Sequence, residues 1–322
     1  MREFSRFHRR LTREAAATRV RWTIALEFGR GVLIAAGKTA AAALTGSVAL
    51  LAEAVHSWVA TVSDVFLVAG YLAALRPADA THPLGYGRES FVWSLFASIG
   101  TFVIGAQVAV WRGLAELDSN DLPAHYGFGY LVLGVSLVSQ ATSFYRALRF
   151  VRARAAQRHS SVLAHVLDTS DAQLRAVVTG DLIALLALVA AALGMAAHQL
   201  TGDAVYDALG SLAIGALMVV AGAFLINQNR RYLVGVPLSA ERSALAIQAI
   251  ERDPRVERVS FFFAEYVGPD RVVLVVRVVV AGEHDQAELA RILHALEQRV
   301  MEHDAVVRAI FSLATPEAED PR

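Results

Sequence analysis

The stretch Leu50-Leu-Ala-Glu-Ala-Val-His-Ser-Trp-Val-Ala-Thr-Val-Ser-Asp64 places ionisable side chains inside a long apolar helical pattern. An ionisable group at membrane depth costs roughly 3 kcal/mol, so it usually marks an ion pathway, an ion pair or a binding site. Residues three or four positions apart share one face of a helix. Glu53, His56, Ala60 and Asp64 are therefore expected to lie along one stripe of this helix.

The composition indicates a membrane protein with a soluble part. The chain has 322 residues, is 55% hydrophobic, and carries no formal net charge, which is too apolar for an ordinary soluble domain. It contains no cysteine, so disulfides and thiolate metal sites are excluded. Any metal must be held by His, Asp or Glu, which suit zinc, manganese, iron or cobalt. No nucleotide loop or nucleophile constellation indicates an enzyme.

Six windows reach the length of about 20 mostly apolar residues that a membrane helix needs. Thr45-Gly-Ser47 separates the first two and predicts a tight helical hairpin. The six predicted spans are approximately 25–44, 47–75, 90–115, 127–146, 176–197 and 204–227.

The distribution of charge predicts the topology. Arginines gather in the N-terminal tail (1–24), after the fourth span and after the sixth span, whereas the opposite loops are acidic. By the positive-inside rule, both termini are cytoplasmic and residues 25–232 form a six-helix transmembrane domain. The alanine- and arginine-rich usage with a single lysine is typical of GC-rich bacteria and indicates the cell (inner) membrane.

The character of the sequence changes after the sixth span. The order helix–strand–strand–helix–strand predicts a small cytoplasmic α+β domain over residues 233–315, followed by a frayed tail at 316–322. Asp285 with Glu288 three residues later is a capping-box pattern at the second helix. The predicted elements are a helix at 239–253, strands at 256–266 and 271–280, a helix at 285–304, and a strand at 306–313.

Depth arithmetic selects two candidate metal ligands. His56 lies nine residues after Ser47. At about 1.5 Å per residue, this places it roughly 13 Å below the outer end of the second span. The fifth span must begin before Leu182, which places Asp181 at least one turn inside the membrane. Imidazole nitrogen and carboxylate oxygen together suit Zn²⁺. A His56–Asp181 hydrogen bond that joins two helices explains the same residues equally well.

Two ion pairs are predicted from the hairpin. Lys38 lies eight residues before Gly46 and Glu53 lies seven after it, so the two side chains have similar depth in antiparallel helices. The same arithmetic places Arg30 opposite Asp64, near the cytoplasmic end. A Lys38–Glu53 pair and an Arg30–Asp64 pair are expected, with a cytoplasmic ion entrance as the alternative role of Asp64.

Other polar residues have local explanations. Asp79 and His82 flank the turn Gly85-Tyr-Gly87, which predicts a rigid reverse turn; a peripheral metal site at Asp79 and His82 is the alternative. Gln140 on the fourth span is expected to form an interhelical hydrogen bond. Asp207 stands at the start of the sixth span and is expected to cap that helix.

Several distinctive segments run in order along nearly the whole length of the chain. They include Lys38, Leu44-Thr-Gly-Ser-Val-Ala-Leu-Leu-Ala-Glu-Ala-Val-His-Ser57, His82-Pro-Leu-Gly-Tyr-Gly-Arg-Glu89 and Asn229-Arg-Arg-Tyr-Leu-Val-Gly235. In these segments the chain resembles the cation diffusion facilitator family. The resemblance implies a ferredoxin-like cytoplasmic domain and a homodimer that exchanges Zn²⁺, or a related ion such as Mn²⁺, Fe²⁺, Co²⁺ or Cd²⁺, for protons by alternating access.

The resemblance also implies a transport site on the second and fifth spans, where His56 and Asp181 match two of the family's ligands. Two positions depart from the pattern. Ala60 stands where the second carboxylate of the second span is usual, and Gly180 stands where Glu usually precedes Asp181. A missing carboxylate changes the charge and coordination number of the site, so its affinity for the ion should fall.

Auxiliary groups are needed if such a site persists. Glu53, Ser57 and Asp64 are the candidates for this role, together with water or a partner chain. In the cytoplasmic domain, Arg277 and Phe311 stand near positions where some members carry metal ligands.

The sequence therefore predicts a divalent-cation transporter with an altered site that moves metal out of the cytoplasm in exchange for protons. Proton coupling would fall mainly on His56, because an imidazole exchanges its proton near neutral pH. A non-transporting partner or regulatory subunit is one alternative, and a transporter of a different cation is another. We expect no cofactor beyond the transported ion, a lipid bilayer as environment, and no nucleic-acid partner.

Overall fold

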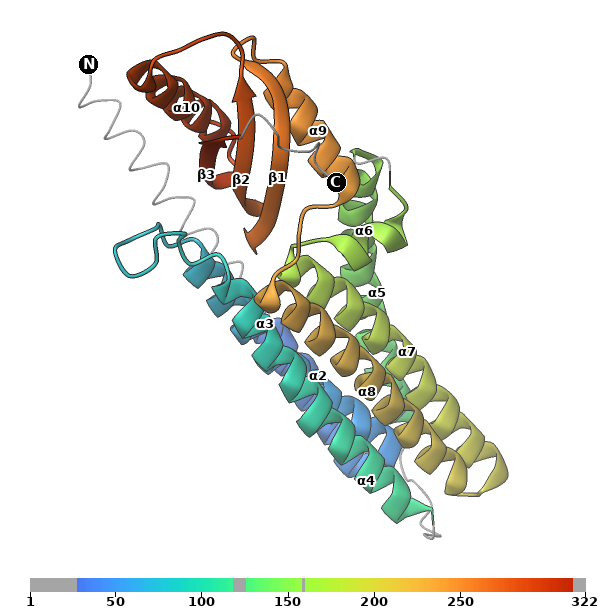
Figure 1. Ribbon diagram of the computed structural model, residues 1–322. Coiled ribbons are helices and arrows are strands. Elements are labelled where there is room, and N and C mark those ends of the chain that lie inside the picture. The colour runs from blue at the N-terminus through green and yellow to red at the C-terminus, as the bar shows by residue number, and fades with distance from the viewer. Residues whose placement is uncertain (1–27, 118–125, 158–159, 315–322) are drawn as a thin grey trace, which may run out of the picture. The chain divides into compact units, whose positions relative to one another are not determined.

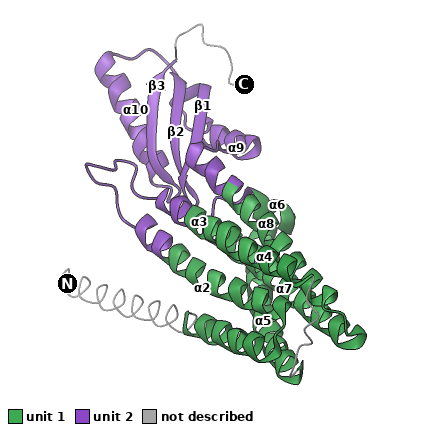
Figure 2. Cartoon of the chain, turned by 90° about the horizontal axis from the view of Figure 1, so that it is seen from below, with its two compact units in different colours: residues 1–68, 94–167, 174–226 green, residues 69–93, 168–173, 227–322 purple. Residues whose placement is uncertain are grey.

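The computed structural model describes residues 28–117, 126–157 and 160–314 (Figure 1). These residues fold into two compact units that alternate along the chain (Figure 2). Unit 1 contains the described residues of 1–68, 94–167 and 174–226. Unit 2 contains those of 69–93, 168–173 and 227–322.

Five helices in the described residues are long and apolar enough to cross a membrane, and they correspond to the second through sixth predicted spans. Residues 28–45 are also helical; whether they form the first span stays a prediction. The five are α2 (Val48–Ala74), a continuous helix made of α3 (Glu89–Gly100), the π-helical segment η1 (Thr101–Ala106) and α4 (Gln107–Glu116), then α5 (Tyr126–Gln157), α7 (Ala172–Thr201) and α8 (Val205–Val234).

Several helices extend beyond their apolar windows, because a helix continues into the polar boundary until a residue stops it. The fourth and sixth helices end at Gln157 and Val234 rather than at 146 and 227. α7 begins at Ala172, which puts Asp181 nine residues inside the helix. It ends before Gly202, whose φ of 74° fits the left-handed conformation common after helix C-termini.

Close packing holds unit 1 together. Because lipid tails are as apolar as leucine, membrane helices associate through tight contacts between small residues rather than through the hydrophobic effect. A Cβ atom added to Gly105 of η1 would overlap Met218 of α8, and one added to Gly222 would lie 2.7 Å from Phe102. The π-helical segment and α8 therefore approach each other at glycines.

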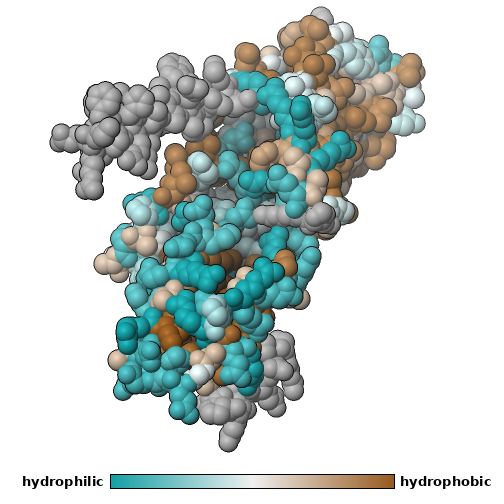
Figure 3. Space-filling model, turned by 90° about the horizontal axis from the view of Figure 1, so that it is seen from above, coloured by the Kyte–Doolittle hydropathy of each residue, from teal (hydrophilic) through white to brown (hydrophobic). Residues whose placement is uncertain are grey.

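Large hydrophobic side chains cover the outside of these helices. Trp111, Val138 and Val220 are 66%, 69% and 65% exposed, which is unusual for a soluble protein and normal for a lipid-facing surface. Figure 3 shows one face on which hydrophobic and hydrophilic side chains gather in separate regions. The protein is therefore a multi-pass membrane protein.

The C-terminal part of unit 2 has the predicted order of elements. β1 pairs with β2 antiparallel, β2 pairs with β3 parallel, and α9 and α10 pack against β1 and β3 (Figure 1). Asp285 caps α10 as predicted, since its Oδ1 accepts from the amide of Glu288 at 2.7 Å. The elements are α9 (Ala240–Glu251), β1 (Val256–Gly268), β2 (Arg271–Val280), α10 (Gln286–Met301) and β3 (Val306–Leu313).

A buried carboxylate just after α9 is bonded to an arginine in the last turn of α10. Asp253 is 2% exposed and accepts from the guanidinium of Arg255 at 2.8 and 2.9 Å and from that of Arg299 at 2.6 Å. The hydrogen bonds from Arg255, with a smaller contribution from Arg299, hold the pKa of Asp253 well below its usual range. Its stabilisation is therefore present above the carboxyl's ordinary pKa and is lost as pH falls through the lowered value.

Asp253→Asn is expected to lower the stability of this domain by about 2 kcal/mol at pH 7, because charge-assisted bonds are lost but the guanidinium groups stay partly exposed. Urea unfolding of the detergent-solubilised protein, followed by far-UV circular dichroism, measures the change. The difference in unfolding free energy between wild type and Asp253→Asn should narrow as pH falls below 4. Glu257→Gln, an exposed acid on β1, is the control; an equal loss there would contradict the assignment.

Candidate metal site

His56 is buried in α2, and one of its ring nitrogens is unbonded within the described part of the chain. Its side chain is 6% exposed, and Nδ1 makes no hydrogen bond to any described residue. Leaving a buried polar atom unsatisfied costs about 1–3 kcal/mol, so such atoms in native structures call for an explanation. An imidazole nitrogen is also a common metal ligand, so this atom is a candidate ligand.

The structure joins Lys38 to Glu53, the pair that the hairpin arithmetic predicts. Lys38 Nζ forms an ion pair with Glu53 Oε2 and donates to Ser57 Oγ at 2.8 Å. Both charged groups are buried, and the second oxygen of Glu53, Oε1, has no partner among the described residues. The charges of Glu53 and Lys38 both act on His56. The four side chains form one polar cluster inside unit 1.

Asp181 is held by α5. Its Oδ1 accepts from Gln140 Nε2 at 2.6 Å and its Oδ2 accepts from Ser143 Oγ at 2.9 Å. Gln140 is therefore the interhelical partner that was predicted. Nδ1 of His56 makes no bond to Asp181, so this nitrogen does not join the two helices.

The two departures from the family pattern are both accommodated by the local geometry. Ala60 lies on an exposed part of α2, and a Cβ atom added to Gly180 would have no neighbour within 4 Å. A carboxylate side chain could therefore be placed at either position without a backbone clash. Within the part of the chain that the structure describes, no three His, Asp or Glu side chains gather as a ready metal cage.

The second predicted ion pair stays a prediction. Arg30 donates to Ser139 Oγ on α5 at 2.8 Å, and Asp64 is an exposed residue of α2. The possible role of Asp64 at an ion entrance is likewise untested.

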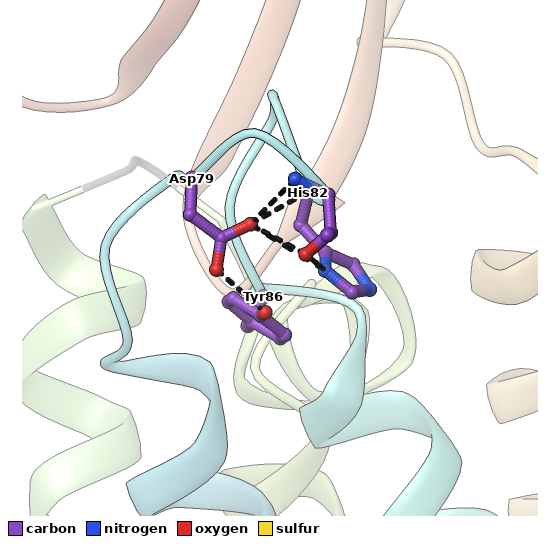
Figure 4. A network of polar contacts seen from close by, with 4 residues as sticks. Asp79, His82 and Tyr86 are labelled. Atoms are coloured by element: carbon purple, nitrogen blue, oxygen red, sulfur yellow. Dashed lines mark hydrogen bonds and ion pairs between the residues drawn. The ribbon is translucent and has the colours of Figure 1, made fainter.

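The loop after α2 is a hydrogen-bonded turn organised by Asp79 (Figure 4). Its Oδ1 accepts from the amide and hydroxyl of Thr81 at 2.9 and 2.7 Å and from the amide of His82 at 2.8 Å, while Oδ2 accepts from Tyr86 at 2.8 Å. These bonds hold the pKa of Asp79 well below its usual range, first those from Thr81 and Tyr86. The geometry favours the rigid turn, and the peripheral metal at Asp79 and His82 stays a hypothesis.

The same loop is anchored within unit 2 by contacts that the sequence did not predict. Arg88 forms an ion pair with Glu265 of β1 at 2.5 Å. A Cβ atom added to Gly87 would lie 2.5 Å from the carbonyl oxygen of Val267, so only glycine fits there. These partners are far apart in sequence, and no local pattern reveals them.

Asp207 caps a different helix from the one predicted. Its carboxylate accepts from Ser47 Oγ at 2.8 Å and from the amides of Val48 and Ala49 at 2.5 and 3.3 Å, so it caps α2. The start of α8 is capped instead by Asp203, whose Oδ1 accepts from the amide of Val205 at 2.9 Å. The prediction was wrong because α2 and α8 start side by side.

Comparison with known proteins identifies the family. Residues 29–234 match the model of the cation efflux transmembrane domain. The chain belongs to the cation efflux family. Members of this family are transporters and not enzymes.

Several curated proteins are similar to this cation efflux protein. Metal tolerance protein C4 of Arabidopsis thaliana is 30% identical over 68% of this chain and 48% of its own length. The mitochondrial proton-coupled zinc antiporter SLC30A9 of Xenopus laevis is 30% identical over 71% of this chain and 41% of its own. Magnetosome protein MamB of Magnetospirillum gryphiswaldense is 24% identical over 85% of this chain and 86% of its own length. The chain thus spans less than half the length of the first two relatives.

Proposed function

We propose that this cation efflux protein transports a divalent cation, with Zn²⁺ as the preferred substrate, in exchange for protons. One observation carries the proposal: the buried imidazole of His56, in a membrane helix, has a ring nitrogen with no hydrogen-bond partner within residues 28–117, 126–157 and 160–314. Family membership and the zinc antiporter among the relatives support it. Transport of a different cation is the main alternative, and competition assays across Zn²⁺, Mn²⁺, Fe²⁺, Co²⁺ and Cd²⁺ distinguish it from a preference for Zn²⁺.

The chemistry follows from the donor set. His56 would supply an imidazole nitrogen and Asp181 a carboxylate oxygen, both good ligands for Zn²⁺. The bonds from Gln140 and Ser143 orient the carboxylate of Asp181, as the hydrogen-bond partners of metal-ligating side chains do. Glu53 Oε1 and Ser57 are auxiliary donors. Because metal ligands must be deprotonated, binding of the cation releases protons, which links the two fluxes.

Restoring the missing carboxylate should strengthen binding. Loss of a single outer-shell partner typically costs about 10–100-fold in metal affinity, so Ala60→Asp, which adds an inner ligand, is expected to raise Zn²⁺ affinity roughly tenfold or more. Isothermal titration of the purified protein measures this change. Ala60→Asn adds an amide of similar size without charge and is the matched control. Equal affinity of wild type and Ala60→Asp would contradict the proposed site.

We further propose a homodimer in the cell membrane with both termini in the cytoplasm. The open face of the sheet supports the dimer: Phe263, Val275 and Ile310 lie across from one another on three strands, and the Phe and Ile side chains are 40% and 48% exposed. A second copy would cover this face. Light scattering of the detergent-purified protein should report twice the mass of one chain, whereas a monomer mass would contradict the dimer.

A second candidate function is a partner or regulatory subunit that keeps the fold without transport. The absence of a three-residue metal cage among the described residues favours it. Co-purification with a complete family member, together with no flux by the protein alone, would establish this function in place of transport.

A further inference from the structure

A second buried histidine in unit 1 is less satisfied than His56. His198 lies near the end of α7 and is 2% exposed, and neither of its ring nitrogens has a hydrogen-bond partner among the described residues. Both nitrogens of a buried imidazole normally find partners. His198 lies seventeen residues after Asp181 on the same helix, about 25 Å along its axis, so it belongs to a different site.

A buried carboxylate lies on the neighbouring helix. α7 and α8 touch at Gly194, where an added Cβ atom would lie 3.0 Å from the carbonyl oxygen of Tyr206 and 3.5 Å from Cα of Asp207. His198 is one turn beyond Gly194 on the same face of α7. His198 and Asp207 also interact electrostatically, and Asp207 is 2% exposed. The two groups therefore share one buried region.

The start of α2 keeps the carboxyl group of Asp207 in place. Its carboxylate accepts from Ser47 Oγ and from two amides at the helix N-terminus, where the helix dipole favours negative charge. Three donors do not fill the roughly four lone-pair positions of a carboxylate. The region thus offers one fixed carboxyl group and two imidazole nitrogens that have no hydrogen-bond partner in the part of the chain that the structure describes. These donor types suit Zn²⁺ and Co²⁺.

We propose that His198 and Asp207 form a second divalent-cation site, at the end of the bundle where α7 ends and α8 begins. Water completes its coordination. The site rests on the proposed transport function in one respect: it would hold the transported ion after the ion leaves His56, on the side opposite the arginine-rich loops.

Co²⁺ binding to the full-length detergent-purified protein tests the site. Isothermal titration should show that His198→Gln loses one of two bound ions, whereas His56→Ala loses only the other. His165→Gln, the same change at a histidine that is 4% exposed on the short helix α6 (Val162–Asp168), is the matched control and should keep both ions. Unchanged stoichiometry in His198→Gln would overturn the inference.

A second variant gives a spectroscopic readout that does not depend on transport. The chain has no cysteine, so His198→Cys introduces a single thiol whose bound Co²⁺ should give a sulfur-to-metal charge-transfer band. Gln199→Cys, at the exposed neighbouring residue, should give none. Absence of the band in folded His198→Cys, or equal bands in both variants, would overturn the site. A band at His198→Cys together with no effect of His56→Ala would keep this site and remove the proposed transport site.

Discussion

His56→Ala is expected to abolish proton-coupled Zn²⁺ transport, with a loss of roughly 100-fold or more in flux. The estimate follows from ligand chemistry: loss of outer-shell partners already costs about 10–100-fold in affinity or activity, and His56 is proposed to touch the ion itself. Asp181→Ala should have a comparable effect, because Asp181 is the ligand that α7 is proposed to supply to the transport site.

Zn²⁺ uptake into vesicles that contain the purified protein, under an imposed pH gradient, measures this loss. His165→Ala replaces another buried imidazole and is expected to keep most of the flux. Both inactive variants must retain the elution volume of wild type on a sizing column. Full flux in His56→Ala and in Asp181→Ala would remove both residues from the transport site.

Lys38→Met is expected to destabilise unit 1 by roughly 3–5 kcal/mol. The substitution removes the partner of a fully buried carboxylate and leaves Glu53 as an uncompensated charge, the circumstance in which breaking an ion pair is most costly. The double variant Lys38→Met with Glu53→Gln removes both charges and should recover most of the loss, since replacing a whole buried pair is often nearly neutral.

Equilibrium unfolding in mixed detergent and dodecyl sulfate micelles measures the free energy for wild type, both single variants and the double variant. The four values form a cycle that isolates the interaction between the two side chains. A coupling energy near zero, or a double variant no more stable than Lys38→Met, would show that the pair does not carry this stability.

The sequence predicts those strands, caps and ion pairs that depend on residues close together in the chain. The two strands Arg271–Val280 and Val306–Leu313 have the predicted bounds, because runs of β-branched residues between turns are read locally. The cap at Asp285 follows from a four-residue pattern. The pairing of Lys38 with Glu53 was also accessible, since a tight hairpin fixes the relative depth of two helices.

Contacts between residues that are far apart in the sequence could not be predicted in this way. The sequence pattern predicts that Asp207 caps its own helix, α8. Its carboxylate caps α2 instead, because the starts of the two helices lie side by side. Arg88 carries no local sign that its partner is Glu265. For the same reason the sequence named Asp181 as a ligand without predicting that Ser143 would hold it. Such partners depend on how the helices pack.

The most direct test of proton-coupled transport follows Zn²⁺ and proton movements together in vesicles reconstituted with the wild-type protein. We expect Zn²⁺ uptake to be accompanied by proton movement in the opposite direction, and His56→Ala to stop both. Wild-type vesicles that move neither Zn²⁺ nor protons, or Zn²⁺ uptake that continues undiminished in His56→Ala, would contradict this expectation.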